Sequence, residues 1–124
     1  MDQNLLVING QALVKALDAE GLVARLAMWV HSTETDTWKL WMVAPVGIED
    51  KREFYRRLAQ TVSRHRTDVG DLDASDVEMV AETHPAVRGL GRFIRAPGLA
   101  SIQFAGNRFD GYYLPEGIIL RSNL

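Results

Sequence analysis

The stretch from Leu22 to His31 limits the fold more than any other part of the chain, because it is apolar on both sets of alternating positions. A strand with one face in water alternates apolar and polar residues, whereas a strand covered on both faces reads as a continuous apolar run. The run is too short to cross a membrane, which takes about 20 apolar residues. We therefore expect residues 22–31 to form a strand inside a sheet with partners on both of its faces.

The length of 124 residues suits one domain with its own core, and we take residues 1–124 as that single domain. Apolar residues make up 47% of the chain and charged residues 24%, a globular composition that argues against disorder. There is no cysteine, which excludes disulfides and thiolate metal sites. The acidic N-terminus and the short apolar run 5–8 do not form a signal peptide. We expect a soluble cytoplasmic protein that does not enter a membrane.

Three segments have the pattern of helices. The first spans about 10–20, with Asn9 as N-cap, a staple between Ile8 and Leu13, and Gly21 after its end. The second runs from about 50 to 65, where Asp50 and Glu53 resemble a capping box and apolar residues recur every fourth position.

The third helix opens at Thr83 or His84, with Pro85 at its first position, and ends before Pro97. Gly89 and Gly91 fall inside it, and each costs about 1 kcal/mol relative to alanine. We expect them either to weaken this helix or to mark a place where another backbone packs closely.

The remaining patterns are those of strands. The polar turn 32–37 joins the first strand to a second at 38–44, and a short strand follows the loop 67–75 at 77–81. In the last quarter we expect three strands at 100–105, 108–114 and 118–121, with turns at 106–107 and 115–117, unless 110–111 is the real turn. The order is α-ββ-α-β-α-βββ. It predicts an α+β domain with three helices and a mixed or antiparallel sheet of about five to six strands.

The spacing of Glu49 and Lys51, with Asp36 upstream, is that of a metal-dependent nuclease site. A simpler interpretation is that the acidic residues at 49 and 50 stabilise the N-terminus of the second helix. The two interpretations differ in whether Asp36, Glu49 and Lys51 converge in the fold.

Other motifs are weaker. Four residues match positions 1, 3, 5 and 12 of a calcium loop, but position 6 lacks its glycine. These residues are Asp71, Asp73, Ser75 and Glu82. The three histidines have no metal-ligand spacing, and a dinucleotide fingerprint beginning at Gly89 breaks at Ile94. We therefore predict no metal site, no cofactor and no catalytic set.

Charge is segregated along the chain although the net charge is only −2. Residues 67–84 contain six acidic residues and neither lysine nor arginine, and the segments on both sides are basic. Arg88, Arg92 and Arg95 recur on one face of the third helix. Either they pair with the acidic segment or with solvent, or they form a contact face for phosphates or carboxylates.

The first hypothesis for function is a non-catalytic interaction module that binds a protein partner or associates with itself. The alternative is a nucleic-acid-binding or metal-dependent nucleic-acid-processing domain that uses an arginine-rich face, and a small enzyme comes third. Trp29, Trp38 and Trp41 cluster on the first hairpin; we expect at least two to be buried, and an exposed one would suggest a binding hot spot. The candidate binding residues are Arg52, Arg56, Arg88, Arg92, Arg95, Trp38 and Trp41.

Overall fold

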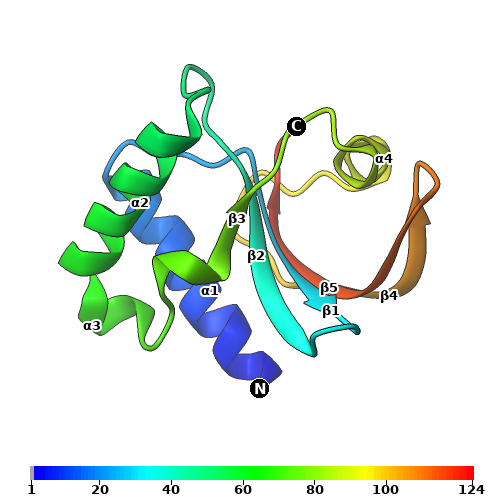
Figure 1. The fold of residues 1–124 in the computed structure, drawn as a ribbon, viewed down its shortest axis with the longest axis horizontal. Coiled ribbons are helices and arrows are strands. Elements are labelled where there is room, and N and C mark those ends of the chain that lie inside the picture. The colour runs from blue at the N-terminus through cyan, green and yellow to red at the C-terminus, as the bar shows by residue number, and fades with distance from the viewer. Residues whose placement is uncertain (1) are drawn as a thin grey trace.

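The chain forms a five-stranded sheet with helices against both of its faces (Figure 1). The computed structural model describes residues 2–124. The strands are β1 (Leu26–Ser32), β2 (Thr37–Val43), β3 (Val77–Met79), β4 (Ile102–Phe109) and β5 (Tyr112–Ser122). Their spatial order is β3-β2-β1-β5-β4, and neighbours are antiparallel except for the parallel pair β2–β3. The α+β class and the mixed sheet predicted from the sequence are confirmed.

The central strand β1 is covered on both faces, as its apolar run predicts. Leu26, Met28 and Val30 are buried in the core cluster on one side of the sheet. Ala27 and Trp29 are buried in the cluster on the other side. The side chains of a strand alternate between faces, so a strand with a core on each side must be apolar at every position.

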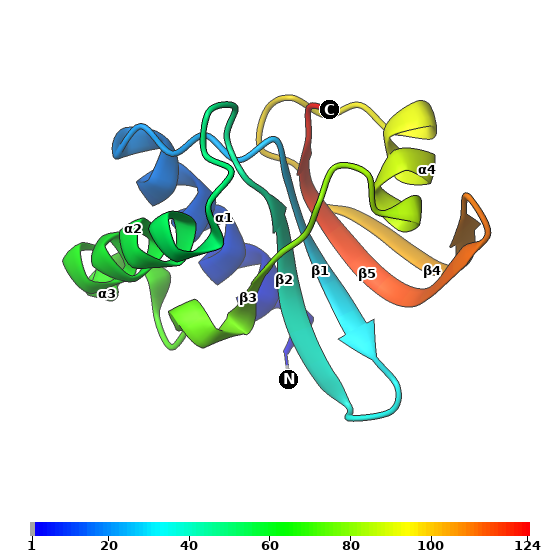
Figure 2. The same ribbon diagram turned by 45° about the horizontal axis from the view of Figure 1, so that its top comes forward.

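The helices divide between these two cores (Figures 1 and 2). The elements are α1 (Gln3–Ala19), α2 (Lys51–Arg64), α3 (Arg66–Val69), η1 (Ala74–Asp76) and α4 (Pro85–Phe93). The long helices α1 and α2 cover one face of the sheet and α4 covers the other. The segment 67–75, expected to be a loop, contains most of α3 and the start of η1.

Helix α1 starts seven residues earlier than expected, so the prediction that Asn9 is its N-cap is wrong. Asp2 caps the helix by accepting a hydrogen bond of 2.9 Å from the backbone of Asn4. Gly10 lies inside α1, where the Trp29 ring packs so closely that a methyl group on Gly10 would lie 2.6 Å from its Nε1 atom. Gly10 therefore allows α1 to pack closely against Trp29 and does not mark the start of the helix. The C-terminus agrees with the prediction, since Gly21 has φ 78° after the helix ends.

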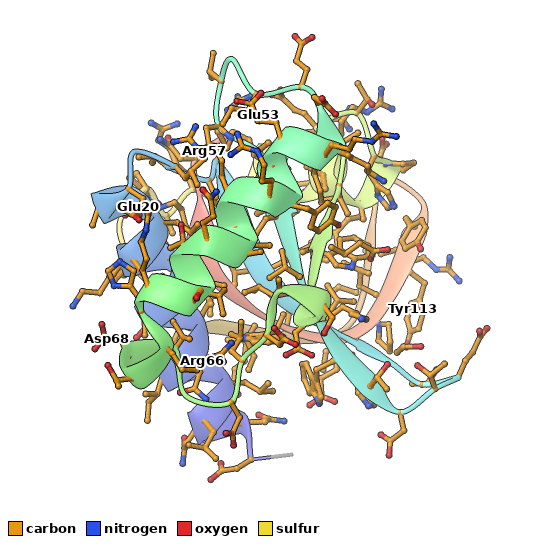
Figure 3. The ribbon with its side chains drawn as sticks, turned by 60° about the vertical axis from the view of Figure 1, so that its left-hand side comes forward. Glu20, Glu53, Arg57, Arg66, Asp68 and Tyr113 are labelled. Carbon is orange, nitrogen blue, oxygen red and sulfur yellow. The ribbon has the colours of Figure 1, made fainter. Side chains whose placement is uncertain are left out.

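Helix α2 matches its predicted bounds and cap. Asp50 accepts a hydrogen bond from the backbone of Arg52, and the apolar stripe packs into the core shared with α1. Figure 3 shows Glu20 and Arg57 where the two helices meet, and the Arg57 guanidinium donates to the Glu20 carbonyl at 3.3 Å. Arg64 also donates to the Glu20 carboxylate at 2.5 Å, and this hydrogen bond lowers the pKa of Glu20.

The C-terminal quarter is one hairpin of two long strands, so the predicted three-stranded meander is wrong. The turn is Asp110–Gly111, the alternative that the sequence left open, and both residues have positive φ (52° and 81°). Gly106 also has positive φ (64°), but it lies inside β4 instead of reversing the chain. Phe104 and Phe109, on either side of Gly106, lie in the same core with their ring centroids 5.5 Å apart, although they are five positions apart.

A partly buried ion pair ties β5 to α1, with the Arg121 side chain 9% and the Asp18 side chain 31% exposed. Arg121 donates to both carboxylate oxygens of Asp18, at 2.8 and 2.7 Å, and to the carbonyl of Pro97 at 3.1 Å. The hydrogen bonds to Asp18 raise the pKa of the Arg121 guanidinium. Asp18 thereby fixes the end of α1 to the sheet.

Candidate interaction surface

Helix α4 is positioned by its N-terminus and its apolar face. His84 caps it, with Nδ1 accepting a 3.1 Å hydrogen bond from the backbone of Ala86, and Pro85 takes the first helical position. Ala86, Val87 and Leu90 are buried in the core on this side of the sheet. The arginines at 88 and 92 therefore face away from the sheet.

Gly89 brings α4 against the turn of the β4–β5 hairpin. A methyl group at Gly89 would lie 2.5 Å from the backbone nitrogen of Asp110 and 2.6 Å from the carbonyl carbon of Phe109. A methyl group at Gly91 would meet only the side chain of Leu124, at 3.1 Å. Gly89 is thus the site of close backbone packing that the sequence suggested, and Gly91 is not.

Asp110, at the tip of the hairpin, lies between two of the α4 arginines. Its carboxylate oxygens are 3.0 Å from Arg88 and 3.5 Å from Arg92. The Arg88 and Arg92 side chains remain 55% and 62% exposed. A shared carboxylate restricts both guanidinium groups and leaves most of their N–H donors facing solvent.

Phe93 follows Arg92 in the chain at the last position of α4, with 79% of its surface exposed. Arg95 lies two residues beyond the end of α4, so the prediction that it shares a face of this helix with Arg88 and Arg92 is wrong. Arg95 is exposed and forms no ion pair with any residue from 2 to 124. We call the residues Arg88, Arg92, Phe93, Arg95 and Asp110 the α4 surface. It combines three cations, one carboxylate and one exposed aromatic ring.

The other two predicted arginines are on a different helix. Arg52 and Arg56 are exposed on α2, which covers the opposite face of the sheet from α4. The five predicted arginines are thus divided between two sides of the sheet. Neither Arg52 nor Arg56 has an acidic partner among the described side chains.

The tryptophans are mostly core residues. Trp29 and Trp41 are buried, in the two different cores, and this agrees with the expectation that at least two are buried. Trp41 packs edge-on against His84 and Tyr112 at centroid distances of 5.0 and 6.5 Å. Trp38 is partly buried on the α1 side of the sheet and contacts the ring of His31. Trp38 and Trp41 consequently do not form one surface.

The residues of the nuclease-like pattern do not converge. Asp36 lies in the turn before β2, with Oδ1 2.9 Å from Nε2 of His31, and Glu49 and Lys51 follow the opposite end of β2. Asp50, between them, caps α2. The acidic residues at this point therefore belong to a helix N-terminus.

Residues of the calcium-loop pattern also make structural contacts with other parts of the chain. Asp73 caps η1, and Glu82 pairs with Arg25 at 2.6 Å. Within residues 2–124, no three His, Asp or Glu side chains are grouped so that they could hold a metal ion.

Sequence reasoning missed two members of the α4 surface. Phe93 lies three positions after Leu90 and seven after Ala86, so it continues the apolar stripe of its helix, and no local signal indicated that it is exposed. Asp110 is far from α4 in sequence, and the predicted meander placed it inside a strand. The acidic segment 67–84 does not supply the partner of these arginines; its own ion pairs go to residues such as Arg25 and Arg66.

No helix among the described residues is both long enough and apolar enough to cross a membrane. Comparisons with protein-family models, with curated proteins and with solved structures find no match to this chain.

Proposed function

We propose that this protein is a non-catalytic interaction module that binds an acidic surface of a protein partner through its α4 surface. One observation carries the proposal: Asp110 pairs with both Arg88 and Arg92 on the helix that ends at Phe93, the most exposed aromatic side chain of residues 2–124. Arginine and aromatic side chains are enriched where protein interfaces concentrate their binding energy.

The shared carboxylate reduces the cost of binding. A free arginine side chain loses about 2 kcal/mol of rotamer entropy when it is fixed. Arg88 and Arg92 already meet Asp110 at 3.0 and 3.5 Å, so part of this entropy is lost before a partner arrives. Their remaining donors suit the paired oxygens of carboxylates.

The same surface favours a protein over a nucleic acid. Asp110 offsets part of the positive charge of Arg88 and Arg92, and the whole chain has a net charge of −2, so the sequence-independent attraction that a phosphate backbone needs is small. The arginines on α2 face away from α4 and add nothing to a continuous basic track. An acidic protein surface needs only a few carboxylates around one apolar contact.

The test is the binding of a fluorescein-labelled peptide in which Asp–Glu pairs alternate with Leu pairs, followed by anisotropy. We expect saturable binding that weakens with salt. Arg88→Gln with Arg92→Gln should weaken it more than about tenfold, since a truncated hot spot costs about 2 kcal/mol or more. The matched control is Arg52→Gln with Arg56→Gln, which removes the same charge from α2 and should leave binding unchanged.

Labelled DNA and RNA oligonucleotides at low salt form the second arm. If they bind more tightly than the peptide, and the α4 variant abolishes that binding, the surface recognises phosphates and the proposal is wrong. Equal losses from the α4 variant and the α2 control would show non-specific attraction and would also overturn it.

A further inference from the structure

A second exposed apolar feature lies at the N-terminal end of α1. Leu5, Leu6, Trp29 and Leu72 line an open hollow of about 150 Å³ between α1 and the segment before η1. Leu6, Trp29 and Leu72 are buried beneath it, whereas Leu5 is 50% exposed. A cavity of this size, lined by apolar side chains, can hold a benzene ring. The hollow is therefore large enough for one aromatic side chain.

Two acidic residues, Asp71 and Asp76, also line this hollow. Asp71 is exposed and forms no ion pair with any of residues 2–124. Carboxylates beside an apolar floor attract a cationic apolar group more than a neutral one.

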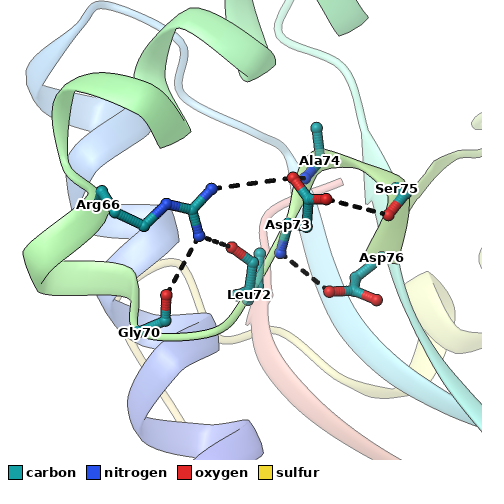
Figure 4. A network of polar contacts seen from close by, with 7 residues as sticks. All are labelled: Arg66, Gly70, Leu72, Asp73, Ala74, Ser75 and Asp76. Carbon is teal, nitrogen blue, oxygen red and sulfur yellow. Dashed lines mark hydrogen bonds and ion pairs between the residues drawn. The ribbon is translucent and has the colours of Figure 1, made fainter.

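The acidic side of the hollow is held in one shape by its own contacts (Figure 4). Arg66 donates to the carbonyl oxygens of Gly70 and Leu72 at 3.2 and 2.8 Å, and its second terminal nitrogen is 3.8 Å from Asp73. Asp76 accepts from the backbone of Asp73 at 2.9 Å. The segment from 70 to 76 is thus fixed in advance, which lowers the entropy cost of filling the hollow.

The hollow and the α4 surface are complementary. The hollow is an apolar concavity with carboxylates on it, and on the α4 surface the exposed Phe93 lies between Arg92 and Arg95 in the chain. The two features lie at opposite ends of the molecule: the start of α1 is at the bottom of Figures 1 and 2, and α4 is at the top right. One copy cannot bring its own Phe93 to its own hollow.

We infer that the acidic partner of the α4 surface is a second copy of this chain. Phe93 of one copy enters the hollow of the next, and the arginines at 92 and 95 face Asp71 and Asp76. This inference rests on the proposed function and names its partner. The contact joins two different surfaces, so it is head-to-tail and builds a ring or an open chain instead of a two-fold dimer.

The test is sedimentation velocity over a concentration series at low and at moderate salt. We expect wild type to associate beyond the dimer and to dissociate as salt rises. Phe93→Ser should weaken association more than about tenfold, and so should Leu5→Ser with Asp71→Lys. The control, Ile8→Ser with Glu34→Lys, makes the same kinds of change at exposed positions outside the hollow and should associate like wild type.

Mixing the two defective variants tests the head-to-tail geometry. Phe93→Ser keeps an intact hollow, and Leu5→Ser with Asp71→Lys keeps an intact Phe93. We expect each alone to be monomeric and their equimolar mixture to form a heterodimer and nothing larger. A mixture that stays monomeric, or an association that neither variant weakens, would overturn the inference.

The two proposals fail differently. A wild-type chain that stays monomeric while the acidic peptide still binds at α4 removes the second copy as partner and leaves the proposed function standing. A monomeric chain that does not bind the peptide removes both.

Discussion

Gly89→Ala should destabilise the protein although alanine is the better helix former. The new methyl group would lie 2.5, 2.6 and 2.9 Å from backbone atoms of Asp110 and Phe109. Backbone atoms cannot rotate away, so α4 and the hairpin turn must separate. Overpacking of this kind costs about 1–3 kcal/mol, and three backbone contacts below 3 Å place the cost near the upper end. After subtracting the helix-propensity gain of about 1 kcal/mol, we expect a net loss of about 2 kcal/mol.

Gly91→Ala is the matched control, because it lies in the same helix with the opposite expected sign. Its methyl group would meet only the Leu124 side chain, with a nearest distance of 3.1 Å, and that side chain can move aside. We expect a gain of up to about 1 kcal/mol from helix propensity.

Urea denaturation measures both variants, and the midpoint should move at constant m-value. For a domain of this size, 1 kcal/mol corresponds to a shift of roughly 4 °C in Tm, so Gly89→Ala should melt about 8 °C lower. If both substitutions raise the midpoint equally, α4 does not rest on the hairpin turn. Asp110 would then not be held beside Arg88 and Arg92, and the reasoning for the α4 surface would be wrong.

Three further substitutions test the rest of the fold. Trp29→Phe loses the 2.8 Å hydrogen bond that its indole nitrogen donates to α1, and should lower the free energy of unfolding by about 2 kcal/mol in urea. Arg121→Met leaves the carboxylate of Asp18 without its partner and should cost about 2–4 kcal/mol by the same measurement, whereas no loss would show that the pair is not formed. Glu20→Gln should reduce the acid sensitivity of stability: the lowered pKa of Glu20 means that its contribution is present above the unfolded-state pKa and is lost as pH falls through the folded-state pKa. Urea midpoints of wild type and Glu20→Gln should therefore differ at neutral pH and converge in acid, and a constant difference would argue against the hydrogen bond from Arg64.

The sequence predicted the layering of the fold because that property is local. Every position of residues 26–30 is apolar, and every one is buried between two cores. Asp50 and Pro85 marked their helix starts correctly, since capping depends on residues within one turn.

Glycines were harder to interpret, because their role depends on what packs against them. The helix was expected to begin at about residue 10, yet Gly10 is inside α1, where the Trp29 ring packs against it. Gly106 has the positive φ that a hairpin turn would need, yet it lies inside β4. The choice between these roles is made by tertiary contacts.

The candidate site was predictable only in part for the same reason. The common face of Arg88 and Arg92 follows from helical periodicity, whereas Arg95 lies beyond the helix end, and Asp110 reaches the first two only because the β4–β5 hairpin turn packs against α4. The hollow joins α1 to a segment more than sixty positions later in the chain. No pattern within either segment predicts that these two distant segments lie side by side.

An NMR titration of the ¹⁵N-labelled chain with the acidic peptide tests the central claim, that the α4 surface binds acidic protein surfaces, most directly. The account predicts chemical-shift changes at residues 88–95 and at the hairpin turn 108–111, with α2 unaffected. Changes centred on Arg52 and Arg56, or a spectrum that does not change at saturating peptide, would contradict it.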